Sequence, residues 1–142
     1  MGLIKSLYGK KIFLDTSPLI NYIEGNNAYV FKLNELFEVK NGCRFVTSVI
    51  TLAEVLVMPL RKGMTGLAKQ YENILTQASN VDIYEINIHI AKETAQLRAK
   101  YKIKTPDAIQ LATAQYCSVD YFLTNDLKLT SVNTNIITLD YL

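Results

Sequence analysis

The chain has 142 residues, a length that fits one domain with a substantial hydrophobic core. Hydrophobic residues make up 49% of the chain and charged residues 20%, which excludes an intrinsically disordered or fibrous protein. The net charge of +2 is far below that of proteins that coat nucleic acid, so charge alone is weak support for a polyanionic partner. We expect one compact domain over residues 1–142.

Neither a membrane segment nor a disulfide is expected. No apolar run reaches the ~18 residues that a membrane span requires, and the apolar stretch at the start is too short for a signal peptide. Cys43 and Cys117 are far apart, lack the spacing of zinc ligands and lie among apolar residues, so we interpret them as buried free thiols. These features indicate a reducing, cytoplasmic location.

The first third of the chain predicts a strand followed by two helices. Residues 10–15 form a short apolar run, typical of a buried strand. Residues 17–25 follow with a serine as N-cap, a proline at the first helical position and a glycine as the stop. Apolar residues spaced three and four apart then predict an amphipathic helix within 28–42.

The middle of the chain repeats this alternation. Residues 44–50 predict a strand, and 51–60 predict a buried helix that Pro59 ends or kinks. Residues 66–79 have the pattern of an amphipathic helix, and 81–88 alternate between apolar and polar residues as a strand does.

The last third predicts two more helices and two more strands. The helices are expected over 90–101 and over 105–117, the second with a threonine cap, and the strands over 121–125 and 135–139. Alternation of this kind predicts an α/β protein with a parallel sheet of about five strands and helices on both faces. In such sheets ligands bind beyond the carboxyl ends of the strands, so the acids at those ends are of interest.

Five of the thirteen acidic residues lie in apolar surroundings in the sequence. Asp15 closes a predicted strand, Glu54 interrupts a predicted buried helix, and Asp107 opens the helix "DAIQLATA". Asp126 follows the strand "YFLTN", and Asp140 follows "IITL". The other acids lie mostly on polar helix faces, where a solvated role is expected.

Ordinary structural roles can explain some of these acids. Asp107 would interact favourably with the dipole of its helix, by ~0.3–1 kcal/mol. Asp126 could cap a short helix over residues 127–131. Glu54 is harder to explain in this way, because a carboxylate on a helix that is apolar on nearly all sides must find a partner.

A bound cation would explain the acids together. If strand ends and helix starts meet at one edge of the sheet, three or four carboxylates would share a cleft, and oxygen ligands suit Mg²⁺ or Mn²⁺ better than zinc. His89 is the single histidine, and the chain has neither a dinucleotide-binding glycine motif nor a Walker loop. The chemistry that remains is metal-assisted hydrolysis of a phosphate ester.

Four stretches of the chain resemble the PIN-domain ribonucleases and, within that family, the small VapC-type toxins. They are "FLDTSPLINYI" with Asp15, "SVITLAEVL" with Glu54, "TPDAIQLATA" with Asp107 and "YFLTNDLKL" with Asp126. The resemblance implies a single PIN-like nuclease domain over residues 1–142, with a sheet between helical layers. It also implies that these four acids hold Mg²⁺ or Mn²⁺. Asp140 is not part of the pattern, so we expect it to have an ordinary structural role.

The resemblance further implies an endoribonuclease that cleaves single-stranded RNA, usually as a homodimer, and serves as the toxin of a type II toxin–antitoxin pair. A small antitoxin would then cover the cleft. We expect Asp15 and Asp107 to bind the metal directly, and Glu54 and Asp126 to hold a second ion or orient water. The expected products carry a 5′-phosphate and a 3′-hydroxyl.

Two other functions remain open at this stage. A metal-dependent phosphatase or nucleotidase acting on small molecules would use the same acids. A catalytically silent RNA-binding or assembly module would have lost its metal, and the four intact acids count against it. An RNA substrate would need positively charged side chains near the acids to bind its phosphates. The basic residues that flank the acidic stretches, which could equally serve only solubility, are Lys10, Lys11, Arg61, Lys62, Lys102 and Lys104.

Overall fold

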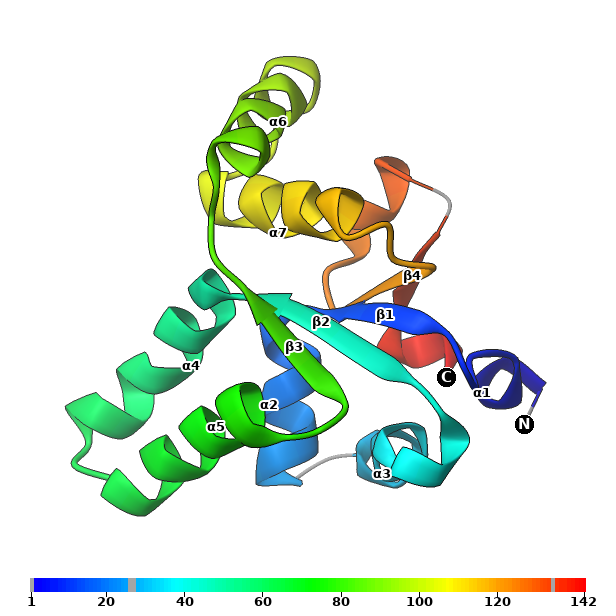
Figure 1. Cartoon of the computed structure of the whole chain (residues 1–142), viewed down its shortest axis with the longest axis vertical. Coiled ribbons are helices and arrows are strands. Elements are labelled where there is room, and N and C mark those ends of the chain that lie inside the picture. The colour runs from blue at the N-terminus through cyan, green and yellow to red at the C-terminus, as the bar shows by residue number, and fades with distance from the viewer. Residues whose placement is uncertain (1, 26–27, 134) are drawn as a thin grey trace. The chain divides into compact units, whose positions relative to one another are not determined.

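Five strands form the sheet of this protein. The structure is a computed structural model that describes residues 2–25, 28–133 and 135–142. The strand order is β3-β2-β1-β4-β5, and the pairings of β1 with β4 and of β4 with β5 are parallel (Figure 1). The predicted α/β fold with a parallel sheet of about five strands is therefore confirmed. The strands are β1 (Lys11–Leu14), β2 (Arg44–Ser48), β3 (Val81–Tyr84), β4 (Tyr121–Thr124) and β5 (Ile136–Thr138).

Helices fill the segments between the strands. In the described part of the chain the α-helices are α1 (Gly2–Ser6), α2 (Thr16–Glu24), α3 (Val30–Phe37), α4 (Val49–Arg61), α5 (Thr65–Gln77), α6 (Ile88–Lys100) and α7 (Thr105–Tyr116). Three short 3₁₀ helices are η1 (Val39–Asn41), η2 (Leu127–Ser131) and η3 (Leu139–Tyr141). Each predicted helix is present, whereas α1 had no counterpart in the sequence prediction.

The chain divides into two compact units. The first unit comprises Met1–Phe45 with Val119–Leu142, and the second unit comprises Val46–Ser118. The boundary between them falls inside β2. A single domain over residues 1–142 stays a prediction.

Aromatic stacking organises the core of the first unit. Phe13 and Phe122 are partners in the register of β1 and β4, and their rings stack at 5.0 Å between centroids with an interplanar angle of 3°. Both rings are buried. A second stack runs from Tyr22 on α2 through Phe37 on α3 to Phe45, with centroid distances of 4.1 and 4.0 Å. These contacts fix α2 and α3 beside the sheet strands of the same unit.

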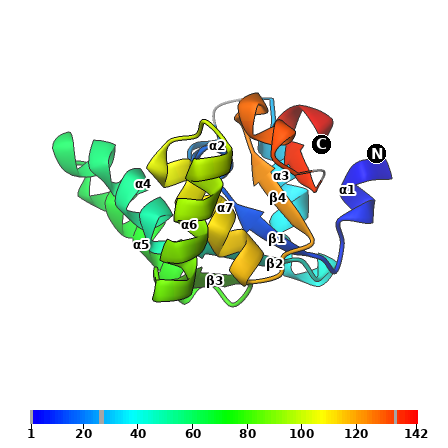
Figure 2. The same cartoon turned by 90° about the horizontal axis from the view of Figure 1, so that it is seen from above.

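Helix pairs make up most of the second unit. Helix α4 packs against α5, and α6 packs against α7, as Figures 1 and 2 show. Helix α4 also contacts α7, and α5 contacts β3. Tyr71 and Leu75 of α5 and Ile90 of α6 are among the fully buried side chains that hold these pairs together.

Helix α2 begins differently from the prediction. Asp15, not Ser17, is the N-cap, because the Asp15 carboxylate accepts a hydrogen bond from the backbone N–H of Thr16. The prediction of a serine cap with proline at the first helical position was therefore wrong. The predicted stop at Gly25 is confirmed, since this residue is the C-cap with a left-handed φ of 60° that favours glycine.

Several other boundaries shift by a few residues. Helix α4 begins at Val49 and continues two residues past Pro59, which lies in its last turn. Helix α7 has Lys104 as its N-cap, so the prediction of a cap at Thr105 was wrong by one residue. Strand β3 ends at Tyr84, and Asn87 caps α6 through its side chain.

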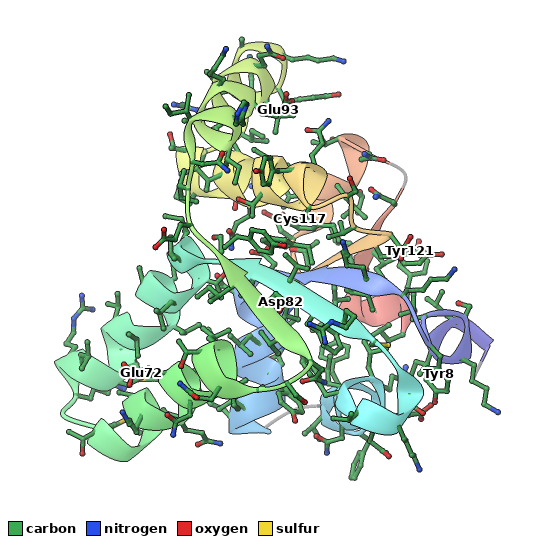
Figure 3. All side chains as sticks on the ribbon, in the orientation of Figure 1. Tyr8, Glu72, Asp82, Glu93, Cys117 and Tyr121 are labelled. Carbon is green, nitrogen blue, oxygen red and sulfur yellow. The ribbon has the colours of Figure 1, made fainter. Side chains whose placement is uncertain are left out.

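The cysteines agree with the sequence analysis. Cys43 and Cys117 are buried free thiols, and burial raises the pKa of the Cys43 thiol, as expected for an unreactive group. Tyr8, labelled in Figure 3, donates a hydrogen bond to Glu35, and this bond raises the pKa of Tyr8 to about 12. Among the described residues, no helix is long and apolar enough to cross a membrane.

The Phe13 and Phe122 stack is expected to be a main source of stability in the first unit. Replacing Phe13 with alanine should lower the free energy of unfolding by about 3–5 kcal/mol, because the change removes a buried ring and leaves a cavity. Urea unfolding followed by circular dichroism measures this. Phe31, which is 81% exposed, is the matched control, and Phe31→Ala should change stability by less than ~0.5 kcal/mol. Equal effects of the two variants would contradict the assignment of the core.

Candidate functional site

Asp15 and Asp126 follow two neighbouring parallel strands of the first unit. Asp15 comes directly after Leu14, the last residue of β1, and Asp126 comes two residues after the end of β4. The strands pair with Leu14 opposite Leu123, and the backbone N–H of Asp15 donates to the carbonyl of Leu123 at 3.0 Å. Parallel pairing thus brings both acids to the carboxyl end of the same strand pair.

The buried side chain of Thr124 joins the two acids. Its hydroxyl donates a hydrogen bond to Oδ2 of Asp15 at 2.8 Å and accepts one from the backbone N–H of Asp126 at 3.0 Å. The Thr124 hydroxyl thus bonds both to an acid of the candidate site and to the local backbone. The hydroxyl therefore holds the Asp15 side chain in place relative to the turn that carries Asp126.

Each of these two acids also caps a helix. Oδ1 of Asp15 accepts from the N–H of Thr16 at 2.9 Å, and Oδ1 of Asp126 accepts from the N–H of Lys128 at 2.9 Å, at the start of η2. The expected capping role of Asp126 is therefore confirmed. A carboxylate has about four acceptor positions, so these hydrogen bonds are compatible with binding a cation as well.

Glu54 lies on α4 in the second unit, in a setting that differs from the prediction. The sequence analysis placed it on a helix that is apolar on nearly all sides, where it would need a partner. In the structure Glu54 is exposed, and so are the neighbouring apolar residues Val57 and Leu60, at 49% and 64%. Helix α4 therefore presents a partly apolar face to solvent. The argument from burial was wrong, and the role of Glu54 rests on the family pattern.

Asp107 is half-buried in the first turn of α7, also in the second unit. This position gives its carboxylate the favourable interaction with the helix dipole that the sequence analysis described. One turn further along α7 lies Gln110, which is 2% exposed. A buried polar side chain requires hydrogen-bond partners, and these partners determine how α7 is held.

Gln110 belongs to a buried polar network that the sequence analysis missed. The Ser48 hydroxyl donates to Oε1 of Gln110, and Nε2 of Gln110 donates to the Thr51 hydroxyl at 2.5 Å. Thr47 also donates to Thr51, at 2.8 Å. The network ties α7 to the end of β2 and the start of α4, and so fixes the helix that carries Asp107 against the helix that carries Glu54.

The structure thus brings Asp15 and Asp126 together in the first unit and places Glu54 and Asp107 on contacting helices in the second. Across residues 2–25, 28–133 and 135–142, no three His, Cys, Asp or Glu side chains form a group that could hold a metal ion. Carboxylate and hydroxyl oxygens are nevertheless the donors that Mg²⁺ and Mn²⁺ prefer, so the residues fit these ions in kind.

The other residues considered in the sequence analysis are Asp140, His89 and the basic residues near the acids. Asp140 accepts a hydrogen bond from the Tyr29 hydroxyl in the first unit, which raises the pKa of Tyr29 and gives Asp140 a structural partner. His89 lies exposed on α6. The basic residues named above lie at the surface, with Lys11 half-buried and the others exposed: Lys10, Arg61, Lys62, Lys102 and Lys104.

The hydrogen bond from Thr124 to Asp15 should be measurable in the stability of the protein. Thr124→Val keeps the shape of the side chain but removes the donor, and should lower the free energy of unfolding by about 1.5–3 kcal/mol, since hydrogen bonds to charged groups are worth this much. Thr124→Ser, which keeps the hydroxyl, should cost less. Thr130 is an exposed threonine, and Thr130→Val should be near neutral in the same denaturation experiment. A neutral Thr124→Val variant would contradict this role of the hydroxyl.

Comparison with solved structures finds the same fold in toxin–antitoxin proteins. A toxin–antitoxin complex from Klebsiella pneumoniae contains a chain 26% identical to this one, with a TM-score of 0.72 over 90% of this chain and 97% of that chain. The sarcin–ricin loop cleaving toxin VapC20 from Mycobacterium tuberculosis is 15% identical, with a TM-score of 0.70 over 86% and 95%. VapBC2 from Rickettsia felis, bound to a promoter DNA fragment, is 17% identical, with a TM-score of 0.70 over 90% and 96%.

The sequence comparisons add the family. No curated protein matches the chain. The family model of the PIN domain matches residues 12–135, a range that includes Asp15, Glu54, Asp107 and Asp126. Since this match covers most of the chain and the fold agrees with it, the chain belongs to the PIN-domain family.

Proposed function

We propose that this protein is a divalent-metal-dependent endoribonuclease that cleaves single-stranded RNA and acts as the toxin of a type II toxin–antitoxin pair. The observation that carries the proposal is the pair Asp15 and Asp126, joined through Thr124 at the carboxyl ends of two parallel strands in a PIN-family chain. The similarity to VapC20, a toxin that cleaves the sarcin–ricin loop, supports RNA as the substrate class.

The proposed metal ligands are the four acids of the family pattern. Asp15 and Asp107 would bind Mg²⁺ or Mn²⁺ directly, and Glu54 and Asp126 would hold a second ion or orient water. When bound, the ion would supply Lewis-acid activation of water and neutralise charge on the phosphate. The hydrogen bonds from Thr16 and Thr124 keep the Asp15 carboxylate oriented, which reduces the cost of arranging a ligand at the time of binding.

The protein side chains have separate tasks in this reaction. Asp126, whose backbone N–H donates to Thr124 and whose carboxylate accepts from the N–H of Lys128, would accept a hydrogen bond from the attacking water and fix its direction. Attack of water on phosphorus would break the bond between phosphorus and the 3′ oxygen, which takes up a proton and becomes a 3′-hydroxyl, and the phosphate would stay on the 5′ oxygen. Basic side chains at the surface would bind flanking phosphates; the candidates are Lys10, Lys11, Arg61, Lys62, Lys102 and Lys104.

The proposed partner is a small antitoxin, and the proposed assembly is a homodimer of the toxin. The solved structures similar to this chain include toxin–antitoxin complexes, which supports a partner of this kind. An antitoxin that covers the acids would block access of RNA to them.

Cleavage of RNA should depend on both a divalent ion and Asp15. With Mg²⁺ or Mn²⁺, the wild-type protein should cut labelled single-stranded RNA, and EDTA should stop the reaction. Asp15→Asn should lower the rate by at least about 100-fold, which corresponds to ~3 kcal/mol of transition-state stabilisation. Asp140→Asn is the matched control, because Asp140 also follows a strand but lies outside the family pattern; it should cut as the wild type does.

Other outcomes of this assay point to other functions. Hydrolysis of nucleotides but not of RNA would identify a small-molecule phosphatase or nucleotidase. Binding of RNA without cleavage in either metal would identify a catalytically silent RNA-binding module. Equal cleavage by the wild type and Asp15→Asn would contradict the proposed role of the carboxylate.

The antitoxin proposal has its own test. A small protein encoded beside this one, when produced together with it, should co-purify with it and suppress RNA cleavage. Size-exclusion chromatography with light scattering measures both the complex and the homodimer of the chain alone. Failure of the neighbouring protein to bind, or cleavage that continues in its presence, would contradict the assignment of a toxin–antitoxin pair.

A further inference from the structure

A pocket with a volume of about 380 Å³ lies between α6 and α7, entirely within the second unit. Its lining residues come from the first three turns of α6 and the second half of α7: His89, Lys92, Glu93, Gln96, Ala112, Gln115 and Tyr116. None of them belongs to the acidic quartet. Ligand pockets in proteins commonly have volumes of ~300–1,000 Å³, so this one can hold a small planar group.

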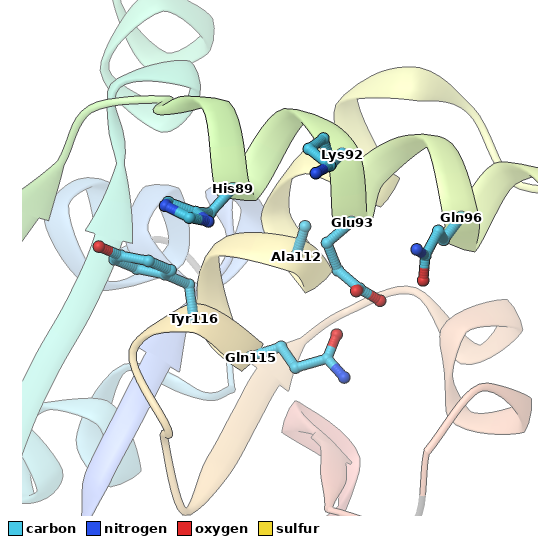
Figure 4. A pocket seen from close by; sticks show the side chains of 7 residues that line it. All are labelled: His89, Lys92, Glu93, Gln96, Ala112, Gln115 and Tyr116. Carbon is cyan, nitrogen blue, oxygen red and sulfur yellow. The ribbon is translucent and has the colours of Figure 1, made fainter.

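Two aromatic rings form one end of the pocket. His89 and Tyr116 stack with 6.3 Å between ring centroids and an interplanar angle of 20° (Figure 4). Both side chains are exposed, so the pair is not part of the hydrophobic core. Aromatic pairs in proteins have ring centroids ~4.5–7 Å apart, so a separation of 6.3 Å is toward the loose end of that range. A planar ligand can replace this contact after a small movement of either side chain.

Hydrogen-bonding groups occupy the other end of the pocket. Figure 4 shows the carboxylate of Glu93 and the amides of Gln96 and Gln115 pointing into the same region, away from the two rings. A carboxylate accepts only, whereas each amide both donates and accepts. The set therefore matches a ligand that presents donors and acceptors along one edge.

The charges of the lining residues favour a neutral ligand over a free anion. Lys92 contributes one positive charge and Glu93 one negative charge, so the pocket has no excess of cations to bind a phosphate. An aromatic surface beside amide and carboxylate groups, with no net charge, instead suits an unpaired nucleobase, which RNA-binding proteins stack on aromatic side chains and hydrogen-bond along its edge.

We propose that the pocket between α6 and α7 binds one unpaired nucleobase of the RNA, stacked on His89 and Tyr116 and read along its edge by Glu93, Gln96 and Gln115. This inference rests on the proposed function for the identity of the polymer. Glu93 accepts hydrogen bonds, so it selects bases that present an exocyclic amino group. Cytosine, which presents one, is therefore bound in preference to uracil, which presents a carbonyl in the same place.

The test measures binding of RNA in the absence of cleavage. Fluorescence anisotropy with labelled oligocytidine and oligouridine of equal length gives affinities for Asp15→Asn and for the same protein carrying Tyr116→Ala. Tyr116→Ala should weaken binding by roughly 5- to 100-fold, the effect of losing one stacked base. Tyr116→Phe keeps the ring and should bind as the parent does. Tyr141, an exposed tyrosine that does not line the pocket, is the matched control, and Tyr141→Ala should not change binding.

The second quantity to measure is the preference of the protein for oligocytidine over oligouridine. In the parent protein oligocytidine should bind more tightly than oligouridine, and Glu93→Gln should reduce that preference, because an amide can also donate to the uracil carbonyl. Glu72→Gln on α5 controls for the loss of one negative charge from the surface. Circular dichroism and thermal unfolding confirm that each variant is folded, so a loss of binding reports on the pocket.

The outcomes separate this inference from the proposed function. Normal binding and normal RNA cleavage by Tyr116→Ala would overturn the nucleobase site and leave the ribonuclease proposal intact. Weaker binding in Tyr116→Ala together with no cleavage by the wild type would support the site and refute the nuclease. Loss of self-association or antitoxin binding with RNA affinity unchanged would overturn the site and assign the surface to a protein partner.

Discussion

The parallel pairing of β1 with β4 is the constraint on which the candidate site in the first unit depends. It sets Leu14 opposite Leu123, so Asp15, which follows β1, and Thr124, the last residue of β4, come within hydrogen-bonding distance. The stacked rings of Phe13 and Phe122 hold the same register from the core side. A shift of one residue in this pairing would place the two rings on opposite faces of the sheet and separate the hydroxyl from the carboxylate. Core packing and the site are therefore fixed by a single register.

In the second unit a polar network has the corresponding role. Gln110 binds Ser48 and Thr51, and the three side chains are buried together between α7, β2 and α4. If one of these side chains lost its hydrogen-bond partners, the free energy of unfolding would fall by about 1–3 kcal/mol. The network therefore strongly favours one arrangement of these elements. Asp107 lies one turn from Gln110 along α7. The network therefore contributes to the proposed reaction by holding the helix that carries Asp107.

The sequence predicted more of the fold than of the surroundings of its acids. Alternating apolar runs and terminal glycines such as Gly25 are local signals, and they located the strands and helices to within a few residues. The exposure of Glu54 could not be predicted, because α4 leaves apolar residues such as Leu60 at its surface, and hydropathy does not record which face is covered. Gln110 gave no signal either, since its partner Ser48 lies 62 residues away.

Binding of Mn²⁺ to the protein tests the central claim most directly, namely that acids from separate parts of the chain hold a common ion. Isothermal titration calorimetry of the wild type, Asp15→Asn, Asp107→Asn and the double variant would measure it. The account predicts tight binding by the wild type, a large loss in each single variant and no further loss in the double variant, because ligands of one ion are not additive. Tight binding retained by both single variants would contradict the account.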